Sequence, residues 1–81
     1  MYYRSTTFTF SDALSPEERL DLLGRLARAT NYFSISIGYV TDDCTVGTSF
    51  PHTWKLICEF LRAARSNGQL TLKDEADIEK V

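Results

Sequence analysis

The fold is decided by the stretch from residue 33 to residue 64, which reads FSISIGYV, TDDC, TVGTSF and PHTWKLICEFLRAA in turn. Side chains on a β-strand point alternately to its two faces. Phe33, Ile35 and Ile37 therefore share one face of the first segment, and Ser34 and Ser36 share the other. This alternation predicts a strand with one face buried and the other open to solvent.

A turn and a second strand follow the first segment. Asp42 and Asp43 favour the turn, because aspartate side chains bind nearby backbone amides and tolerate unusual dihedral angles. Residues 44–50 alternate again, with Cys44 and Val46 on one side and Thr45 on the other. The two alternating segments therefore predict a β-hairpin.

A long apolar helix is predicted after Pro51, and it ends near Ser66 because Asn67-Gly68 is a typical stop signal. Its apolar surface is wider than a surface helix needs. One side must face the sheet, and the other must cover the first helix or meet a partner. The sheet-facing stripe comprises Trp54, Ile57, Cys58, Leu61 and Ala64, and a homodimer is expected through Leu56, Phe60 and Ala63.

Upstream of this stretch, the sequence predicts a strand and another helix. Residues 3–11 are rich in the β-branched and aromatic residues that strands favour. Ser15, Pro16 and Glu18 together indicate a helix start, as the cap, the first helical residue and the partner in a capping box. A helical period of about 100° per residue then predicts the core-facing set Leu20, Leu23, Leu26, Ala27 and Thr30.

The whole chain, residues 1–81, is expected to form a single domain, and residues 69–81 an acidic tail or short helix, with a brief edge strand at Leu70 and Leu72 as the alternative. The order β-α-β-β-α predicts an α+β fold whose three-stranded sheet carries both helices on one face. We expect the first strand to lie beside the third. The other face would be rich in hydroxyl groups and nearly uncharged, with Thr7, Thr9, Ser34, Ser36, Gly38, Thr45, Gly47 and Ser49.

Composition limits the classes of function. A chain of 81 residues has one modest core, and a net charge of −2 does not favour non-specific binding to nucleic acid. Two cysteines are too few for a disulfide framework, so both are expected to be reduced. No apolar run suits a signal peptide or a membrane span. We therefore expect a complete cytoplasmic protein.

Residues with catalytic potential are scattered and do not form a recognisable motif. His52 is the only histidine, and its position at a helix start favours an exposed ring over a nucleophilic pair with Cys44 oriented by an aspartate. A zinc site from Cys44, His52 and Cys58 fails on spacing, because Cys58 belongs to the core-facing stripe. We expect no catalytic residues, no metal and no cofactor.

Charged residues offer two candidate binding surfaces. Four arginines on the predicted helices would form a patch for phosphate or acidic side chains if the helices are neighbours, although ordinary solvated faces that keep the helices soluble are the simpler explanation. The acidic residues near the C-terminus would mimic nucleic acid toward a basic partner, or would simply solvate a terminal helix. The arginines are Arg25, Arg28, Arg62 and Arg65, and the acidic residues include Asp74, Glu75 and Asp77.

In size, mild acidity and lack of catalytic residues, the chain resembles the small inhibitors encoded by phages and other mobile elements, of which anti-CRISPR proteins are the best-known group. The β-α-β-β-α order over residues 3–66 is also similar to the DNA-damage-inducible DinI family. The first resemblance implies a non-enzymatic inhibitor that occupies the surface of a host protein complex, such as a nucleic-acid-binding CRISPR-Cas complex, in the host cytoplasm. The alternative is a small nucleic-acid-binding or DinI-like regulator that uses the arginines or the acidic tail. The expected partner-binding residues are Ser34, Ser36, Thr45, Asp42, Asp43, Arg25, Arg28, Arg62, Arg65, Asp74, Glu75 and Asp77.

Overall fold

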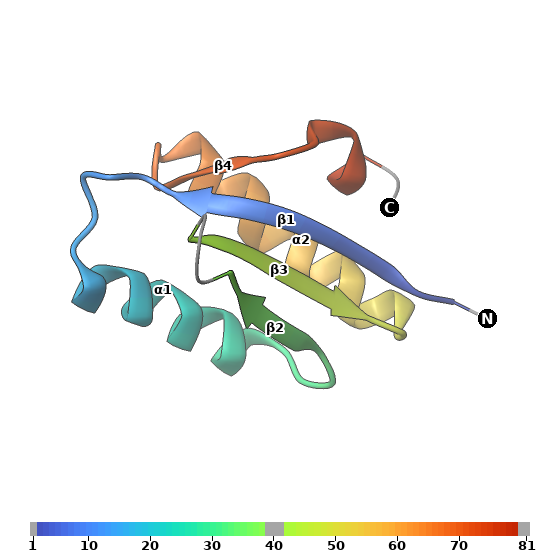
Figure 1. Ribbon diagram of the computed structural model, residues 1–81. Coiled ribbons are helices and arrows are strands. Elements are labelled where there is room, and N and C mark those ends of the chain that lie inside the picture. The colour runs from blue at the N-terminus through green and yellow to red at the C-terminus, as the bar shows by residue number, and fades with distance from the viewer. Residues whose placement is uncertain (1, 39–41, 80–81) are drawn as a thin grey trace.

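The computed structural model describes residues 2–38 and 42–79, which form a four-stranded antiparallel sheet with two α-helices (Figure 1). The predicted α+β class and the two helices are therefore confirmed. The chain runs β1 (Arg4–Phe10), α1 (Pro16–Ala29), β2 (Ser34–Ile37), β3 (Asp43–Thr48), α2 (Pro51–Ser66), β4 (Leu70–Leu72) and the short 3-10 helix η1 (Glu75–Ile78).

The sheet has the strand order β2-β3-β1-β4, so β1 lies beside β3 as predicted. The prediction of three strands is wrong, because Leu70 and Leu72 pair with Phe10 and Phe8 and add a fourth. Three residues suffice for this strand, since both leucines are buried beside those phenylalanines. Residues 70–78 thus contain a strand followed by a short helix. The element order β-α-β-β-α-β is that of the ferredoxin-like, split β-α-β arrangement.

Local sequence signals fix the start of α1 and the end of α2. The Ser15 N–H donates to Glu18 Oε1 at 2.9 Å, and the Glu18 N–H donates to Ser15 Oγ at 3.2 Å, which confirms the capping box. At the end of α2, Gly68 adopts a φ of +72° that favours glycine. Its N–H donates to the Arg65 carbonyl, and that of Gln69 donates to the Ala64 carbonyl, both at 3.0 Å. These two bonds form a Schellman motif and confirm the predicted helix stop.

Both helices pack on one face of the sheet, as predicted. Figure 1 shows α2 crossing behind the strands and α1 lying on the β2 side. The predicted sheet-facing stripe of α2 is buried in full, and it joins side chains from α1, β1, β3, β4 and η1 in one core. The buried apolar residues are Phe8, Phe10, Leu22, Leu26, Cys44, Val46, Trp54, Ile57, Cys58, Leu61, Ala64, Leu70, Leu72 and Ile78.

The buried stripe of α1 differs from the predicted one. Leu22 and Leu26 are buried, whereas Leu20 is 68% exposed. Leu22 lines a hollow with Phe60 and Ala64 of α2, so the inward face of α1 is turned toward its neighbouring helix as well as toward the sheet. A period of 3.6 residues identifies apolar stripes, but the position of the neighbouring helix decides which stripe is buried.

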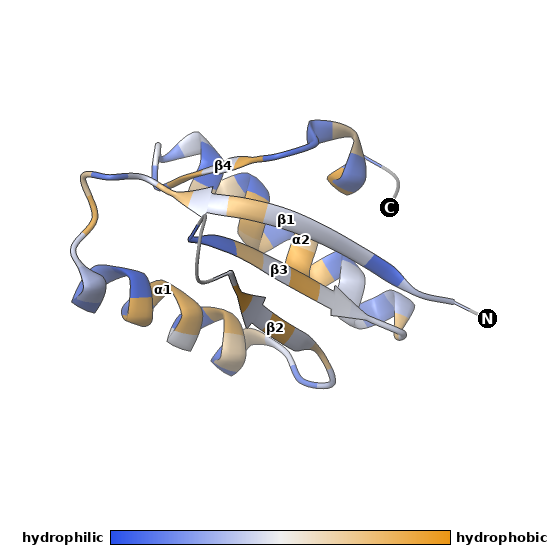
Figure 2. Cartoon of the chain, viewed as in Figure 1, coloured by the Kyte–Doolittle hydropathy of each residue, from blue (hydrophilic) through white to orange (hydrophobic). Residues whose placement is uncertain are grey.

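Strand β2 is more exposed than its alternation predicts. Ile35 and Ile37 lie opposite Val46 and Cys44 of β3, so they do share the core-facing side of the sheet. The two residues are nevertheless 38% and 55% exposed, because β2 is an edge strand; Figure 2 shows hydrophobic colouring on this outermost strand. Only Phe33, just before the strand, packs partly against the core. Gly38 lies just past this strand, and the last two residues of the predicted segment, 39 and 40, lie outside the described residues.

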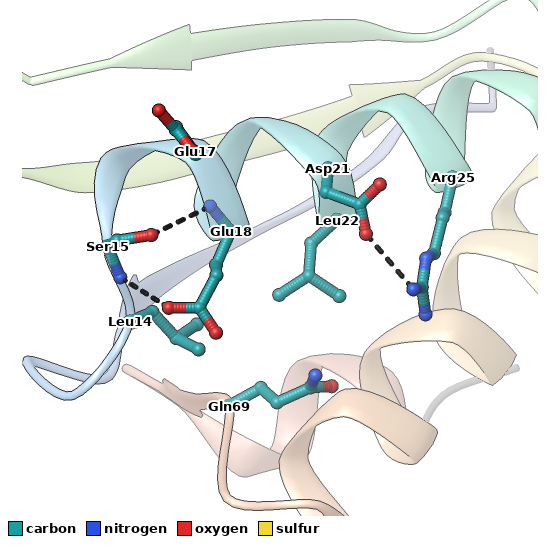
Figure 3. Close-up of a pocket in the computed structure, with 8 residues that line it drawn as sticks. All are labelled: Leu14, Ser15, Glu17, Glu18, Asp21, Leu22, Arg25 and Gln69. Atoms are coloured by element: carbon teal, nitrogen blue, oxygen red, sulfur yellow. Dashed lines mark hydrogen bonds and ion pairs between the residues drawn. The ribbon is translucent and has the colours of Figure 1, made fainter.

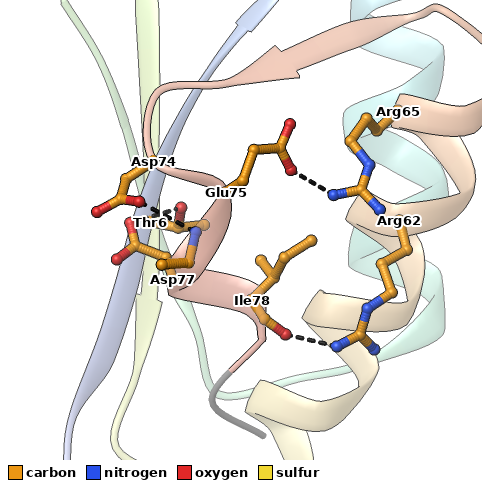
Figure 4. Close-up of polar contacts among 8 residues, drawn as sticks. Thr6, Arg62, Arg65, Asp74, Glu75, Asp77 and Ile78 are labelled. Carbon is orange, nitrogen blue, oxygen red and sulfur yellow. Dashed lines mark hydrogen bonds and ion pairs between the residues drawn. The ribbon is translucent and has the colours of Figure 1, made fainter.

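The C-terminal segment packs against the domain through η1 (Figure 4). Ile78 is fully buried, and the Arg62 guanidinium donates to its carbonyl oxygen at 2.5 Å. The Thr6 hydroxyl donates to Asp77 at 3.0 Å, which satisfies a buried threonine of β1. Arg65 forms an ion pair with Glu75. These contacts make the acidic segment part of the fold.

Candidate protein-binding surface

The side of the sheet opposite the helices is built from rows of paired residues. Residues that lie opposite one another in an antiparallel pair point to the same face. One row contains Ser34, Gly47 and Ser5, the next contains Ser36, Thr45 and Thr7, and the third contains Asp43, Thr9 and Thr71. We call the hydroxyl-bearing members of these rows the hydroxyl face: Ser5, Thr7, Thr9, Ser34, Ser36, Thr45 and Thr71.

Hydrogen bonds across the strands order the centre of the hydroxyl face. The hydroxyls of Thr7 and Thr45 lie 3.0 Å apart, and the Thr9 hydroxyl donates to Asp43 at 2.6 Å. Lys73 approaches the same Asp43 carboxylate at 3.9 Å, so the charge of Asp43 is partly compensated. Thr7, Thr9 and Thr45 are half-buried, whereas Thr71 on β4 and the two serines of β2, Ser34 and Ser36, are exposed. The predicted hydroxyl-rich plane is therefore present and internally ordered.

One aromatic side chain lies on this side of the sheet at the Gly47 row. Tyr3 approaches Gly47 so closely that a Cβ there would collide with the phenol ring. A larger residue at position 47 would displace the tyrosine ring and would also crowd the Arg4 carbonyl oxygen, 3.1 Å from the Cβ position. Tyr3 itself remains 53% exposed. The predicted open position at Gly47 is thus covered by a tyrosine that presents apolar area beside the hydroxyl groups.

A second feature is an apolar hollow between α1 and the end of β2. Its volume is about 290 Å³, and its wall is mainly apolar, with one arginine and one aspartate at the rim. Arg19 is held there by hydrogen bonds of 3.3 Å to the carbonyls of Leu14 and Ser11. The residues around the hollow are Phe10, Pro16, Arg19, Leu20, Leu23, Ile37, Asp42 and Cys44.

A larger hollow of about 380 Å³ lies at the start of α1 and is rich in carboxylates (Figure 3). Hydrogen bonds from the backbone and then the side chain of Ser15 lower the pKa of Glu18, which closes the capping box. Asp21 forms an ion pair with Arg25 at 3.0 Å. Both carboxylates therefore stabilise the helix, and the lowered pKa of Glu18 is the opposite of what a general acid needs.

The two thiols lie in the core. Cys44 and Cys58 are 1% and 0% exposed, and burial raises the pKa of each. For Cys44, the nearby charge of Arg19 opposes this rise and that of Asp43 adds to it. A buried thiol with a raised pKa is a poor nucleophile at neutral pH. His52 is exposed at the start of α2, as predicted.

The four predicted arginines have different surroundings. Arg62 and Arg65 bind the C-terminal segment, as described above. Arg25 pairs with Asp21 of its own helix, and Arg28 is exposed near the end of α1. Within residues 2–38 and 42–79, three of these four guanidinium groups therefore have a partner.

The predicted acidic residues also make internal contacts. Asp74 caps η1 by accepting from the Ala76 N–H at 3.0 Å, while Glu75 and Asp77 hold that helix against α2 and β1. Asp42 is exposed and has a φ of +56°. Sequence reasoning missed these roles because Thr6 and Asp77 are 71 positions apart, and no local pattern links them.

The broad apolar side of α2, predicted to form a homodimer, lies next to α1. Leu56 lines a hollow with Ala29, and Phe60 lines another with Leu22. Leu56 and Phe60 are half-buried, and Ala63 is exposed. Helix α1 therefore covers much of the wide apolar surface of α2.

No helix within residues 2–38 and 42–79 has the length and apolar character needed to cross a membrane. Comparison of the chain with protein-family models, with curated proteins and with solved structures gives no match. A functional hypothesis therefore depends on the residues and their arrangement.

Proposed function

We propose that this protein is a non-enzymatic binding module that inhibits a larger protein complex by occupying its surface with the hydroxyl face. The observation that carries the proposal is that three rows on one side of the sheet carry mainly serine and threonine side chains, while both helices pack on the other side. A sheet surface is already ordered before binding, so it loses little conformational entropy when it docks.

The chemistry of the hydroxyl face favours a protein partner over a phosphate backbone. Hydroxyl groups donate and accept hydrogen bonds, so they match the mixed polar groups of a protein surface. Phosphate binding depends mainly on arginine and lysine. Lys73, at the edge of this surface, shares its charge with Asp43. Tyr3 supplies the kind of exposed aromatic side chain that often dominates binding energy.

The resemblance to small phage-encoded inhibitors supports a choice of first partner. We propose a nucleic-acid-binding defence complex of the CRISPR-Cas kind, met in the cytoplasm of the host cell. Inhibition by this route needs only a stable contact that blocks the working surface of the complex. The activity of the target should therefore fall in proportion to the fraction of target bound.

A capture experiment tests the proposal. The full chain, immobilised through a tag, is incubated with host lysate, and retained proteins are identified and quantified. We expect one protein complex in stoichiometric amount, and purified complex should lose activity when the chain is added. Recovery of no protein would contradict the proposal. Binding of the chain to nucleic acid alone, with a steep dependence on salt, would instead support the alternative regulator.

A further inference from the structure

The outer edge of β2 offers backbone groups for pairing. The Gly38 N–H donates to the Asp43 carbonyl at 2.8 Å, so Gly38 directs its hydrogen-bonding groups toward β3. In an antiparallel pair this direction alternates from residue to residue. Ser36 and Ser34 therefore also face β3, and the N–H and C=O groups of Ile35 and Ile37 point to the open edge of the sheet.

The β2 edge lacks the features that usually prevent strand addition. Charged side chains, proline and bulges protect sheet edges. Ser34–Ile37 has none of these, and its register with β3 is continuous. The opposite edge is protected, because β4 is followed by Lys73 and by η1, which packs against β1.

Exposed apolar side chains continue from this edge onto α1. Ile35 and Ile37 are 38% and 55% exposed on the helix side of the sheet, and Leu20 of α1 is 68% exposed. Leu20 and Ile37 line the same apolar hollow. An added strand at β2 would bring side chains next to this apolar surface and remove part of it from water, which favours association.

We propose that a second copy of this chain pairs antiparallel with β2 about a two-fold axis at Ser36. In this register Ile35 lies opposite Ile37 of the second copy, and Ser34 lies opposite its Gly38. Each isoleucine pair exchanges both backbone hydrogen bonds, because all of these groups point outward. On the hydroxyl face, each serine then lies opposite a serine or a glycine of the other copy. On the helix side, each isoleucine lies opposite an isoleucine.

The strand itself selects this register. A two-fold axis between two residues would place isoleucine opposite serine and would join unlike faces of the sheets. An axis at Ile35 would pair Ile37 with Phe33, which lies outside the strand next to Tyr32 with its φ of +64°. An axis at Ser36 keeps the pairing within residues 34–38. The resulting eight-stranded sheet would join two hydroxyl faces, a consequence that does not depend on the proposed function.

A cysteine at position 36 tests the register directly. In a pair without mutual hydrogen bonds, opposite Cα atoms lie about 4.5 Å apart, within the range of about 4.4–6.8 Å that disulfides span. S36C should therefore form a covalent dimer under mild oxidation. S34C is the matched control, because its two copies would lie roughly 13 Å apart, four strand residues from each other. T71C is a second control on the other edge strand, and the native cysteines are buried.

Sedimentation equilibrium on the purified wild-type chain tests the association itself. We expect a mass of twice 9.2 kDa at high concentration, and we expect I37K to remain monomeric with an unchanged circular dichroism spectrum. A wild-type monomer at the highest soluble concentration would overturn the proposal. Crosslinking of S36C no faster than that of S34C or T71C would overturn the register. Both measurements use pure protein, so a failed lysate capture would leave them unaffected.

Discussion

Replacing Ile78 by alanine tests whether the acidic C-terminal segment belongs to the core. The side chain is fully buried and packs in the same cluster as the apolar residues of α2. The substitution removes three carbon atoms, which is roughly 2.4 kcal/mol at about 0.8 kcal/mol for each buried methylene. The cavity left behind adds to this, so the free energy of unfolding should fall by about 3–4 kcal/mol.

Such a loss would be large for this protein. At about 0.05–0.15 kcal/mol per residue, a chain of 81 residues has a total stability of roughly 4–12 kcal/mol. Urea unfolding, followed by fluorescence of the buried Trp54, should show a lower midpoint with an unchanged slope. L20A is the matched control, because it removes as many carbons from a side chain that is 68% exposed.

The control should change the free energy of unfolding by less than about 1 kcal/mol. Equal losses of unfolding free energy in I78A and L20A would refute the reasoning, because they would mean that the acidic tail is frayed and leaves Ile78 in solvent. If I78A showed no unfolding transition at all, the result would agree with a buried Ile78, since the expected loss of free energy approaches the lower limit of total stability.

Three further predictions concern caps and thiols. Gly68→Ala should lower the free energy of unfolding by about 1–2 kcal/mol, because alanine is strained at a φ of +72°; an unchanged urea midpoint would contradict this. Ser15→Ala should cost about 1 kcal/mol near neutral pH. Because Ser15 lowers the pKa of Glu18 from its ordinary value of 4.5, the stabilisation is present above that value and is lost as pH falls through the lower folded one. The loss of stability that Glu18→Ala causes in urea unfolding should therefore shrink in acid, and equal losses at both pH values would argue against the capping box. Cys44 and Cys58 should be alkylated slowly in the folded protein and rapidly in denaturant, since burial raises the pKa of both thiols; rapid alkylation of folded Cys44 would restore the nucleophile hypothesis.

Short-range signals predicted much of this fold correctly. The capping box at Ser15 and Glu18 and the helix stop at Asn67-Gly68 depend on residues within about four positions of each other. The alternation in β1 and β3 correctly separated the buried residues from the hydroxyl face. Most of the candidate site therefore follows from strand periodicity, because the period fixes the face to which each side chain points.

Features that depend on the identity of a neighbour were not predictable from local patterns. Periodicity placed Ile35 and Ile37 on the helix side, but it gave no sign that β2 would be an edge strand with little cover. The partners of Arg62 and Arg65 lie in a different element of the chain, and each choice of partner depends on how η1 packs. The fourth strand is only three residues long, so it gave too short an alternation to decide between strand and helix.

The central claim, that the hydroxyl face binds the partner, is tested most directly by the capture of that partner with two arginine variants. T45R places a long cation in the middle row of the hydroxyl face, whereas S66R adds the same side chain at an exposed position on α2. Both variants should keep the circular dichroism spectrum of the wild type. We predict that S66R retains the partner complex in stoichiometric amount and that T45R loses it. Equal retention by the two folded variants would contradict the account.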